Sequence, residues 1–264
     1  MELKVFEIVN ALHKAAADLM DLSIATAIFE YGPLLHILTY SLNLLIITPE
    51  IFFILFNNLF LTMKVLFLIS GGLDSPIAAY LGIKRGWIPT FLYFDGYPFF
   101  SGKSITIKKI EQLMKITGVS GKIIIVPHSK DLKIIIEKCK RNLSCLLCKR
   151  MMYRKAEVIA KLYECDAIVT GEIIGEQASQ TIRNLTVNDK VINIPIIRPL
   201  LGLNKVEVEA IANKIGIIEV SSESCKAAAI KARTKVKEEE LLKEEEKIPI
   251  NELIEEGIKN MEIL

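Results

Sequence analysis

The segment from Val65 to Pro76, VLFLISGGLDSP, constrains the fold of this chain more than any other segment. An apolar run, Val65 to Ile69, leads into a turn with two adjacent glycines, and the residues from Ile77 to Leu81 are typical of a helix. Glycines allow the backbone to approach a phosphate closely, and the first N–H groups of a helix point toward it. The segment therefore predicts a phosphate-binding turn between a buried strand and a helix.

Asp74 lies inside this turn, close to the hydroxyl side chains of Ser70 and Ser75. A carboxylate repels a phosphate unless a cation lies between them, so Asp74 indicates Mg²⁺, which carboxylates and substrate phosphates commonly share. The pattern SGG-x-DS lacks the lysine of one common phosphate signature and the glycine spacing of the other. A turn that uses Gly71 and Gly72 for geometry alone is the alternative, but it gives no role to Asp74.

Strands and helices alternate from residue 63 onward. The chain has 264 residues, of which 51% are hydrophobic, so it can bury a sizeable core. The alternation is typical of an α/β fold with a Rossmann-like parallel sheet and helices on both faces, whose ligands bind at the carboxyl ends of the strands. The expected strands are 65–69, 90–94, 122–126 and 167–170, and the expected helices are 77–85, 105–117, 132–140, about 149–163, and 204–215.

Residues 1–62 differ from the rest of the chain. They carry two lysines against six acidic residues, and residues 31–49 form an uncharged run. Three interpretations are open: sequence upstream of a biological start at Met63, which we favour, a membrane anchor, or a soluble helical extension. We divide the chain into this leader, a phosphate-binding domain at 63–230, and a charged helical tail at 231–264, in which we expect residues 231–247 to form a solvated helix.

The five cysteines include one CxxC pair, Cys145 and Cys148. The odd number and the acidic start of the chain favour a reducing compartment, the cytoplasm. Three interpretations of the pair are open. It is a redox or persulfide pair whose thiol pKa is lowered by a helix N-terminus and nearby basic residues, or it holds an iron–sulfur cluster with Cys225 as third ligand, or it is simply buried. His128 is more typical of a hydrogen-bonded loop residue than of a catalyst.

Two further loops follow expected strands at the same sheet edge. The loop TGEIIGEQASQT, residues 170–181, has small and polar side chains that suit close approach of a ligand, or it is an ordinary connection. The aromatic-rich loop from Tyr93 to Phe100 offers rings, Phe94 among them, on which an adenine or another base could stack. Packing over the sheet edge is the alternative for these rings.

Four segments, in this order, resemble the ATP-pyrophosphatase (PP-loop) domain of the tRNA 4-thiouridine synthetases, also called tRNA sulfurtransferases. They are SGGLDSPIAAY at 70–80, CLLCKRMMYRKAEVIA at 145–160, TGEIIGEQASQTIRNL at 170–185 and PIIRPLLGLNKVEVEAIANKIG at 195–216. The resemblance implies an enzyme that adenylates a uridine carbonyl oxygen and then displaces AMP with sulfur. It also implies ATP and Mg²⁺ as cofactors.

The resemblance carries roles over to individual residues. It implies that Asp74, Cys145, Cys148 and Cys225 are catalytic, the cysteines by handling sulfur with or without an iron–sulfur cluster. The residues implied to bind ATP or border the substrate are Ser70, Gly71, Gly72, Asp74, Ser75, Gly171, Glu172, Gln177, Ser179 and Gln180. Phe94 is added to the expected nucleotide contacts because of its place in the aromatic loop.

The family's N-terminal RNA-binding modules have no counterpart in residues 1–62, and no rhodanese segment follows the domain. The expected partners are therefore tRNA or a protein that supplies RNA binding, together with a sulfur donor; a homodimer is left open. Two other functions compete with sulfur transfer: an adenylating ligase that uses an amine, which gives no role to the CxxC pair, and a nucleotide-binding regulatory subunit.

Protein expressed from Met63 should be soluble and should bind ATP as the whole chain does. The physical reason is that an α/β unit of roughly 200 residues buries enough surface to fold alone. The measurement is ATP binding with size-exclusion chromatography on both proteins. An insoluble shorter protein beside a monodisperse whole chain would contradict the prediction.

Overall fold

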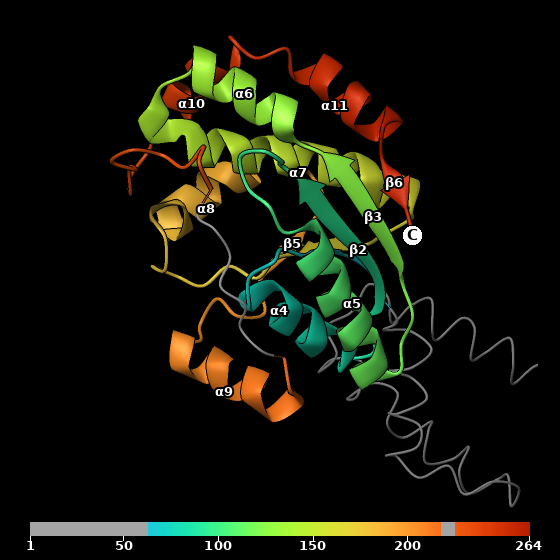
Figure 1. Ribbon diagram of the computed structural model, residues 1–264. Coiled ribbons are helices and arrows are strands. Elements are labelled where there is room, and N and C mark those ends of the chain that lie inside the picture. The colour runs from blue at the N-terminus through green and yellow to red at the C-terminus, as the bar shows by residue number, and fades with distance from the viewer. Residues whose placement is uncertain (1–62, 218–224) are drawn as a thin grey trace, which may run out of the picture. The chain divides into compact units, whose positions relative to one another are not determined.

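The computed structural model describes residues 63–217 and 225–264, and the predicted leader at 1–62 lies outside them. The chain divides into two units, 1–59 and 60–264, and only the second is described here. Its described residues form one sheet with the strand order β5-β4-β1-β2-β3-β6 (Figure 1). The pairs from β5 across to β3 are parallel, and β6 pairs antiparallel with β3 at one edge. The predicted α/β fold with a mainly parallel sheet is confirmed.

The expected elements are present, with ends shifted by a few residues. The strands are β1 (Lys64–Leu68), β2 (Ile88–Asp95), β3 (Lys122–Pro127), β4 (Ala167–Val169), β5 (Ile196–Ile197) and β6 (Glu262–Ile263). The helices are α4 (Asp74–Ile83), α5 (Lys103–Thr117), α6 (Ser129–Lys138), α7 (Ser144–Leu162), α8 (Ile182–Asp189), α9 (Lys205–Ile215), α10 (Glu238–Glu245) and α11 (Ile250–Lys259), with short 3-10 turns at Arg141–Leu143 and Ala178–Gln180. The sequence did not indicate β5 and β6, because two residues are too few to show a period. No described helix combines the length and apolarity needed to cross a bilayer.

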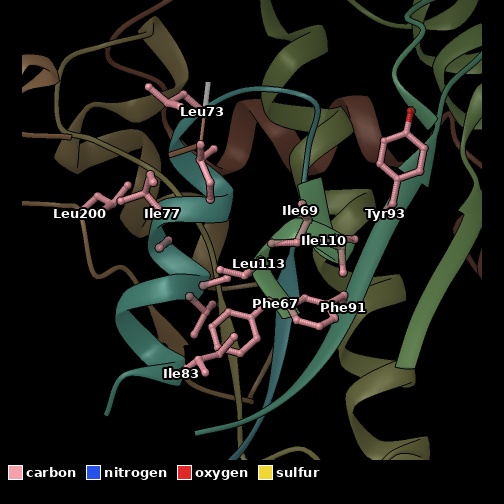
Figure 2. Packing of buried hydrophobic residues seen from close by; sticks show 14 of the residues in the cluster. Phe67, Ile69, Leu73, Ile77, Ile83, Phe91, Tyr93, Ile110, Leu113 and Leu200 are labelled. Atoms are coloured by element: carbon pink, nitrogen blue, oxygen red, sulfur yellow. The ribbon is translucent and has the colours of Figure 1, made fainter. Parts of the chain in front are cut away.

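Alternate residues of the strands build two separate cores, because successive strand side chains point to opposite faces. Phe67 and Phe91 pack against α4, α5 and α9, where Ile77, Ile110 and Leu113 cover one face of the sheet (Figure 2). On the other face, the neighbouring strand residues contact α7; they are Leu66, Leu92, Phe94, Ile124, Val126 and Ile168. Both faces are covered, which explains why the strands are continuous apolar runs.

The segment 231–264 packs on the face of the sheet that α7 covers, where α10 and α11 contact α7. Glu244 and Glu245 of α10 are buried, so the predicted solvated helix is wrong at these positions. The guanidinium of Arg150, in α7, donates to both carboxylate oxygens of Glu245 at 2.7 and 2.9 Å, and Arg154 donates to the same carboxylate. The buried Arg150 and the partly buried Arg154 explain the difference, because a run of glutamates alone does not reveal distant cationic partners.

Replacing Glu245 by alanine should lower the free energy of unfolding by about 3–5 kcal/mol, because it leaves the buried guanidinium of Arg150 without its carboxylate. Urea unfolding monitored by circular dichroism measures the change. Glu164→Ala is the matched control, since its ion pair with Lys64 is solvent-exposed and its loss should change stability far less. Equal losses in the two variants would contradict the role given to the buried pair.

Candidate functional site

A pocket of about 490 Å³ lies at the carboxyl ends of β1, β2 and β4. The loops that follow these three strands supply most of its walls, as expected for a parallel sheet. Helix α7 and the segment that begins at Cys225 supply the rest. Its lining residues include Ser70, Gly71, Gly72, Asp74, Ser75, Tyr93, Phe100, Lys149, Tyr153, Gly171, Glu172, Gln177, Gln180 and Cys225.

The turn after β1 is held closed by its own hydroxyl groups. The backbone N–H of Ser70 donates to Ser75 Oγ at 2.8 Å, and the two serine hydroxyls lie 3.0 Å apart. Helix α4 begins at Asp74, so its first N–H groups face the same side as the glycines. Serine hydroxyls, glycine backbone and a helix N-terminus therefore meet at the pocket, which is the geometry of an anion site.

Asp74 has a basic partner that the sequence did not indicate. Lys205, the first residue of α9, places its Nζ 2.9 Å from Asp74 Oδ1. Asn204 caps this helix: its side chain accepts the backbone N–H of Glu207, and the Glu207 side chain accepts the backbone N–H of Asn204. This capping box fixes the start of the helix and so the position of the Lys205 backbone. A lysine thus reaches the phosphate turn from a helix far along the sequence, although SGG-x-DS itself contains none.

Gly171 brings the loop after β4 against the turn after β1. A Cβ atom at this position would lie 2.5 Å from the backbone nitrogen of Ser75 and 2.6 Å from its Cα. No side chain fits at that distance, so only glycine allows the two loops to touch. The predicted grouping of Gly171 with Ser75 in one site is supported by this contact.

Glu172 is the centre of a buried polar cluster beside the pocket. Lys149 donates to its Oε1 at 2.6 Å, and Arg198 donates to its Oε2 at 2.6 Å. The hydroxyls of Tyr153 and Thr170 each donate to Oε2 at 3.0 Å. Burial alone would raise the pKa of Glu172, but the charges of Lys149 and Arg198 prevail and lower it to about 2. Glu172 is therefore ionised and orients Lys149 at the pocket wall.

Two residues predicted to contact the ligand, Phe94 and Ser179, do not line this pocket. Phe94 is 5% exposed and packs in the second core, with its ring centroid 5.5 Å from that of His128. The reason is strand alternation: Tyr93 and Phe94 are neighbours, so only Tyr93 can line the pocket. Ser179 is also buried and does not line it. Tyr93 and Phe100 are the aromatic side chains beside the predicted phosphate turn.

The three predicted cysteines lie around one side of the pocket, but only Cys225 lines it. The CxxC pair lies within the first turns of α7, which begins at Ser144 rather than after the pair. Cys145 Sγ accepts the backbone N–H of Ala229 at 3.2 Å, so the pair is held against the segment that follows Cys225. The backbone N–H of Lys226 donates to Phe99 O, which fixes that segment to the aromatic loop.

Cys148 lies 3.2 Å from Nε2 of His128, and both side chains avoid the pocket. Burial raises the pKa of the Cys148 thiol well above its usual range, and nearby Cys145 and Cys225 raise it further. The pKa of Cys225 is also raised, chiefly by burial. The predicted lowering of thiol pKa by the helix N-terminus and basic neighbours is therefore wrong for Cys148. Burial of His128, with the charge of Lys155, lowers the imidazole pKa and keeps the ring neutral.

Among the described residues, no three or more histidine, cysteine or carboxylate side chains lie together in a way that could hold one metal ion. The three cysteines thus do not present a ready ligand set, and an iron–sulfur cluster stays a prediction of the sequence. Asp74 differs, because Mg²⁺ needs only one or two carboxylates and takes its other ligands from phosphates and water.

One family model of known proteins matches most of the described unit. Residues 60–250 match the family model of the thiamine biosynthesis protein (ThiI). A probable tRNA sulfurtransferase of Methanocaldococcus jannaschii is 38% identical over 195 residues, which are 71% of this chain and 50% of that protein. A probable tRNA sulfurtransferase of Moorella thermoacetica is 35% identical over 210 residues, covering 77% of this chain and 54% of the relative.

A solved structure, the crystal structure of a 4-thiouridine synthetase–RNA complex with bound ATP, has a similar fold. It superposes with a TM-score of 0.70 at 30% sequence identity, over 76% of this chain and 55% of that one. The chain thus spans about half the length of the relatives and of the structure that it matches.

The buried carboxylate of Glu172 should make stability depend on pH. Its pKa is lowered in the folded state, so it stabilises the fold fully above the unfolded value of 4.5, and this contribution is lost as pH falls toward about 2. Between pH 4 and pH 3 the wild type should lose about 1 kcal/mol more than Glu172→Gln. Urea unfolding at several pH values measures the difference. Parallel pH profiles for the two proteins would contradict the assignment.

Proposed function

Because the chain belongs to the family of the thiamine biosynthesis protein ThiI, we propose that it is an ATP-dependent sulfurtransferase that acts on a uridine of tRNA. One observation carries the proposal: a single pocket is lined by the phosphate turn and by the thiol-bearing residue Cys225. Adenylation needs the first feature and sulfur transfer needs the second, and both must act on the same substrate carbon. An adenylating ligase that uses an amine would need only the first.

ATP would bind with its phosphates against the turn from Ser70 to Ser75. The serine hydroxyls and the N-terminus of α4 would hold the β- and γ-phosphates, and Asp74 would hold Mg²⁺ together with them. The metal, when bound, would neutralise charge on the phosphates as pyrophosphate leaves. Lys205 lies beside Asp74 and would add a second positive charge at the same place. The substrate carbonyl oxygen attacks the α-phosphorus, and the bond to pyrophosphate breaks.

Sulfur would then arrive as a persulfide on Cys225. Its terminal sulfur attacks the activated carbon, and AMP leaves with the electron pair of the broken C–O bond. A second thiol, for which Cys145 is the best placed because its sulfur contacts the segment after Cys225, attacks the Cys225 sulfur. The thiolated product is released, a disulfide remains, and a dithiol reductant must restore the two thiols.

The relatives and the similar solved structure support tRNA as the substrate class. Two relatives are probable tRNA sulfurtransferases, and the similar solved structure is a complex of a 4-thiouridine synthetase with RNA and ATP. This chain spans about half of those proteins, so RNA binding would be shared with further protein, and the sulfur donor would be a separate partner. None of the five cysteines forms a disulfide in this structure, which suits work in the cytoplasm.

Two variants should separate the two half-reactions. Asp74→Ala should reduce ATP–pyrophosphate exchange by at least about 100-fold, because the phosphates lose the group that holds their cation. Cys225→Ser should keep this exchange within about threefold yet abolish thiolated nucleoside, since only the second step needs the thiol. Exchange is measured with labelled pyrophosphate, and nucleosides of digested tRNA are measured by mass spectrometry.

Cys165→Ala is the matched control, because Cys165 is a reduced cysteine in the second core and does not line the pocket. It should keep both activities. Wild-type exchange in Asp74→Ala would contradict the role of the turn. Thiolated nucleoside that survives replacement of all three cysteines around the pocket would contradict the role of the thiols, and an aminated product without any thiolated one would favour the adenylating ligase.

A further inference from the structure

Lys109 is a buried lysine that lies beneath the phosphate turn. It belongs to α5 and is 4% exposed, and it does not line the pocket. Its Nζ donates to the carbonyl oxygen of Gly71 at 2.7 Å and to that of Gly72 at 3.0 Å. Both glycines do line the pocket, so the ammonium group contacts them from the opposite side of the turn.

These two hydrogen bonds set the orientation of two peptide groups. In a planar trans peptide the carbonyl oxygen and the following N–H point in opposite directions. When Lys109 holds the carbonyl oxygens of Gly71 and Gly72, the N–H groups of Gly72 and Leu73 are turned away from it. The N–H of Gly72 donates to the hydroxyl of Ser70 at 3.4 Å, and Ser70 lines the pocket, so this N–H lies on the side from which an anion would approach. Glycine has little conformational preference of its own, so an external group must fix this orientation.

Burial makes these hydrogen bonds necessary for Lys109. An ammonium group in an apolar environment is costly, so a lysine is seldom buried there without specific partners. The carbonyl oxygens of Gly71 and Gly72 are such partners. The two peptide groups that they orient make a backbone anion site.

We propose that Lys109 is a positioning residue that sets the phosphate turn for the pyrophosphate part of ATP. The proposal rests on the proposed function, because it takes the turn to be the ATP phosphate site. Lys109 would contact no reacting atom; it would act through the backbone of Gly71 and Gly72. Its loss should therefore weaken binding of phosphates and leave binding of the nucleoside unchanged.

The test compares Lys109→Met with the wild-type chain. Methionine keeps an unbranched side chain of similar length in the buried position and removes the ammonium group. Calorimetry should show that ATP and inorganic pyrophosphate bind at least about tenfold more weakly, whereas adenosine binds within about twofold of the wild type. Lys108→Met is the matched control, because Lys108 is the adjacent, exposed lysine of α5, and its affinities should not change.

Two results would overturn the proposal: unchanged pyrophosphate affinity in a folded Lys109→Met protein, or equal losses for pyrophosphate and adenosine, which indicate general damage. If the methionine variant does not fold, Lys109→Gln, which keeps one donor, takes its place. In wild-type protein labelled with ¹⁵N-lysine, a protected ammonium signal should also shift when pyrophosphate binds, and no shift would overturn the proposal without any variant. Failure of the wild-type chain to bind ATP would instead refute the proposed function.

Discussion

β1 and β4 run parallel and side by side, with Val65 opposite Ala167 and Phe67 opposite Val169. The loops that follow the two strands therefore leave the sheet at the same edge, although about a hundred residues separate them in sequence. Gly171 then touches the backbone of Ser75, and this contact joins the phosphate turn to the loop that carries Glu172. Every other part of the pocket is arranged around this pair of loops, so a side chain at position 171 would separate them.

The pocket is bordered by charges that are fixed rather than mobile. Glu172 holds Lys149 and Arg198, and Arg198 also donates to both carboxylate oxygens of Asp189. Side chains held in buried ion pairs need little reorientation when a ligand binds. Charges preorganised in this way stabilise the charge that develops in a transition state. Two neighbouring residues of α7 have different partners. Lys149 lines the pocket and pairs with Glu172, whereas Arg150 pairs with Glu245 of the C-terminal segment.

The C-terminal segment contributes to the same architecture. Its helix α10 supplies Glu245 to the arginines of α7, and β6 extends the sheet beside β3. Helix α7 also carries Cys145 and Cys148, so the position of the CxxC pair depends on this packing. Burial of Cys148 against His128 is one consequence, and it reverses the direction of the thiol pKa that the local sequence suggests. Desolvation of this partly buried thiol outweighs the helix N-terminus here.

Local sequence determined the parallel α/β architecture, the phosphate turn and the loop at Gly171, because each depends on residues adjacent in the chain. Apolar runs of five residues, a Gly-Gly turn and helical periodicity are all readable at short range. The tertiary structure decided the contacts of Lys109, Lys205 and Arg150, because a lone lysine or arginine carries no local signal of its partner. It also decided which face each strand residue occupies, and so placed Tyr93 at the pocket and Phe94 in the core. A period of two shows that neighbouring residues face apart, but only the packing of helices shows which face meets the ligand.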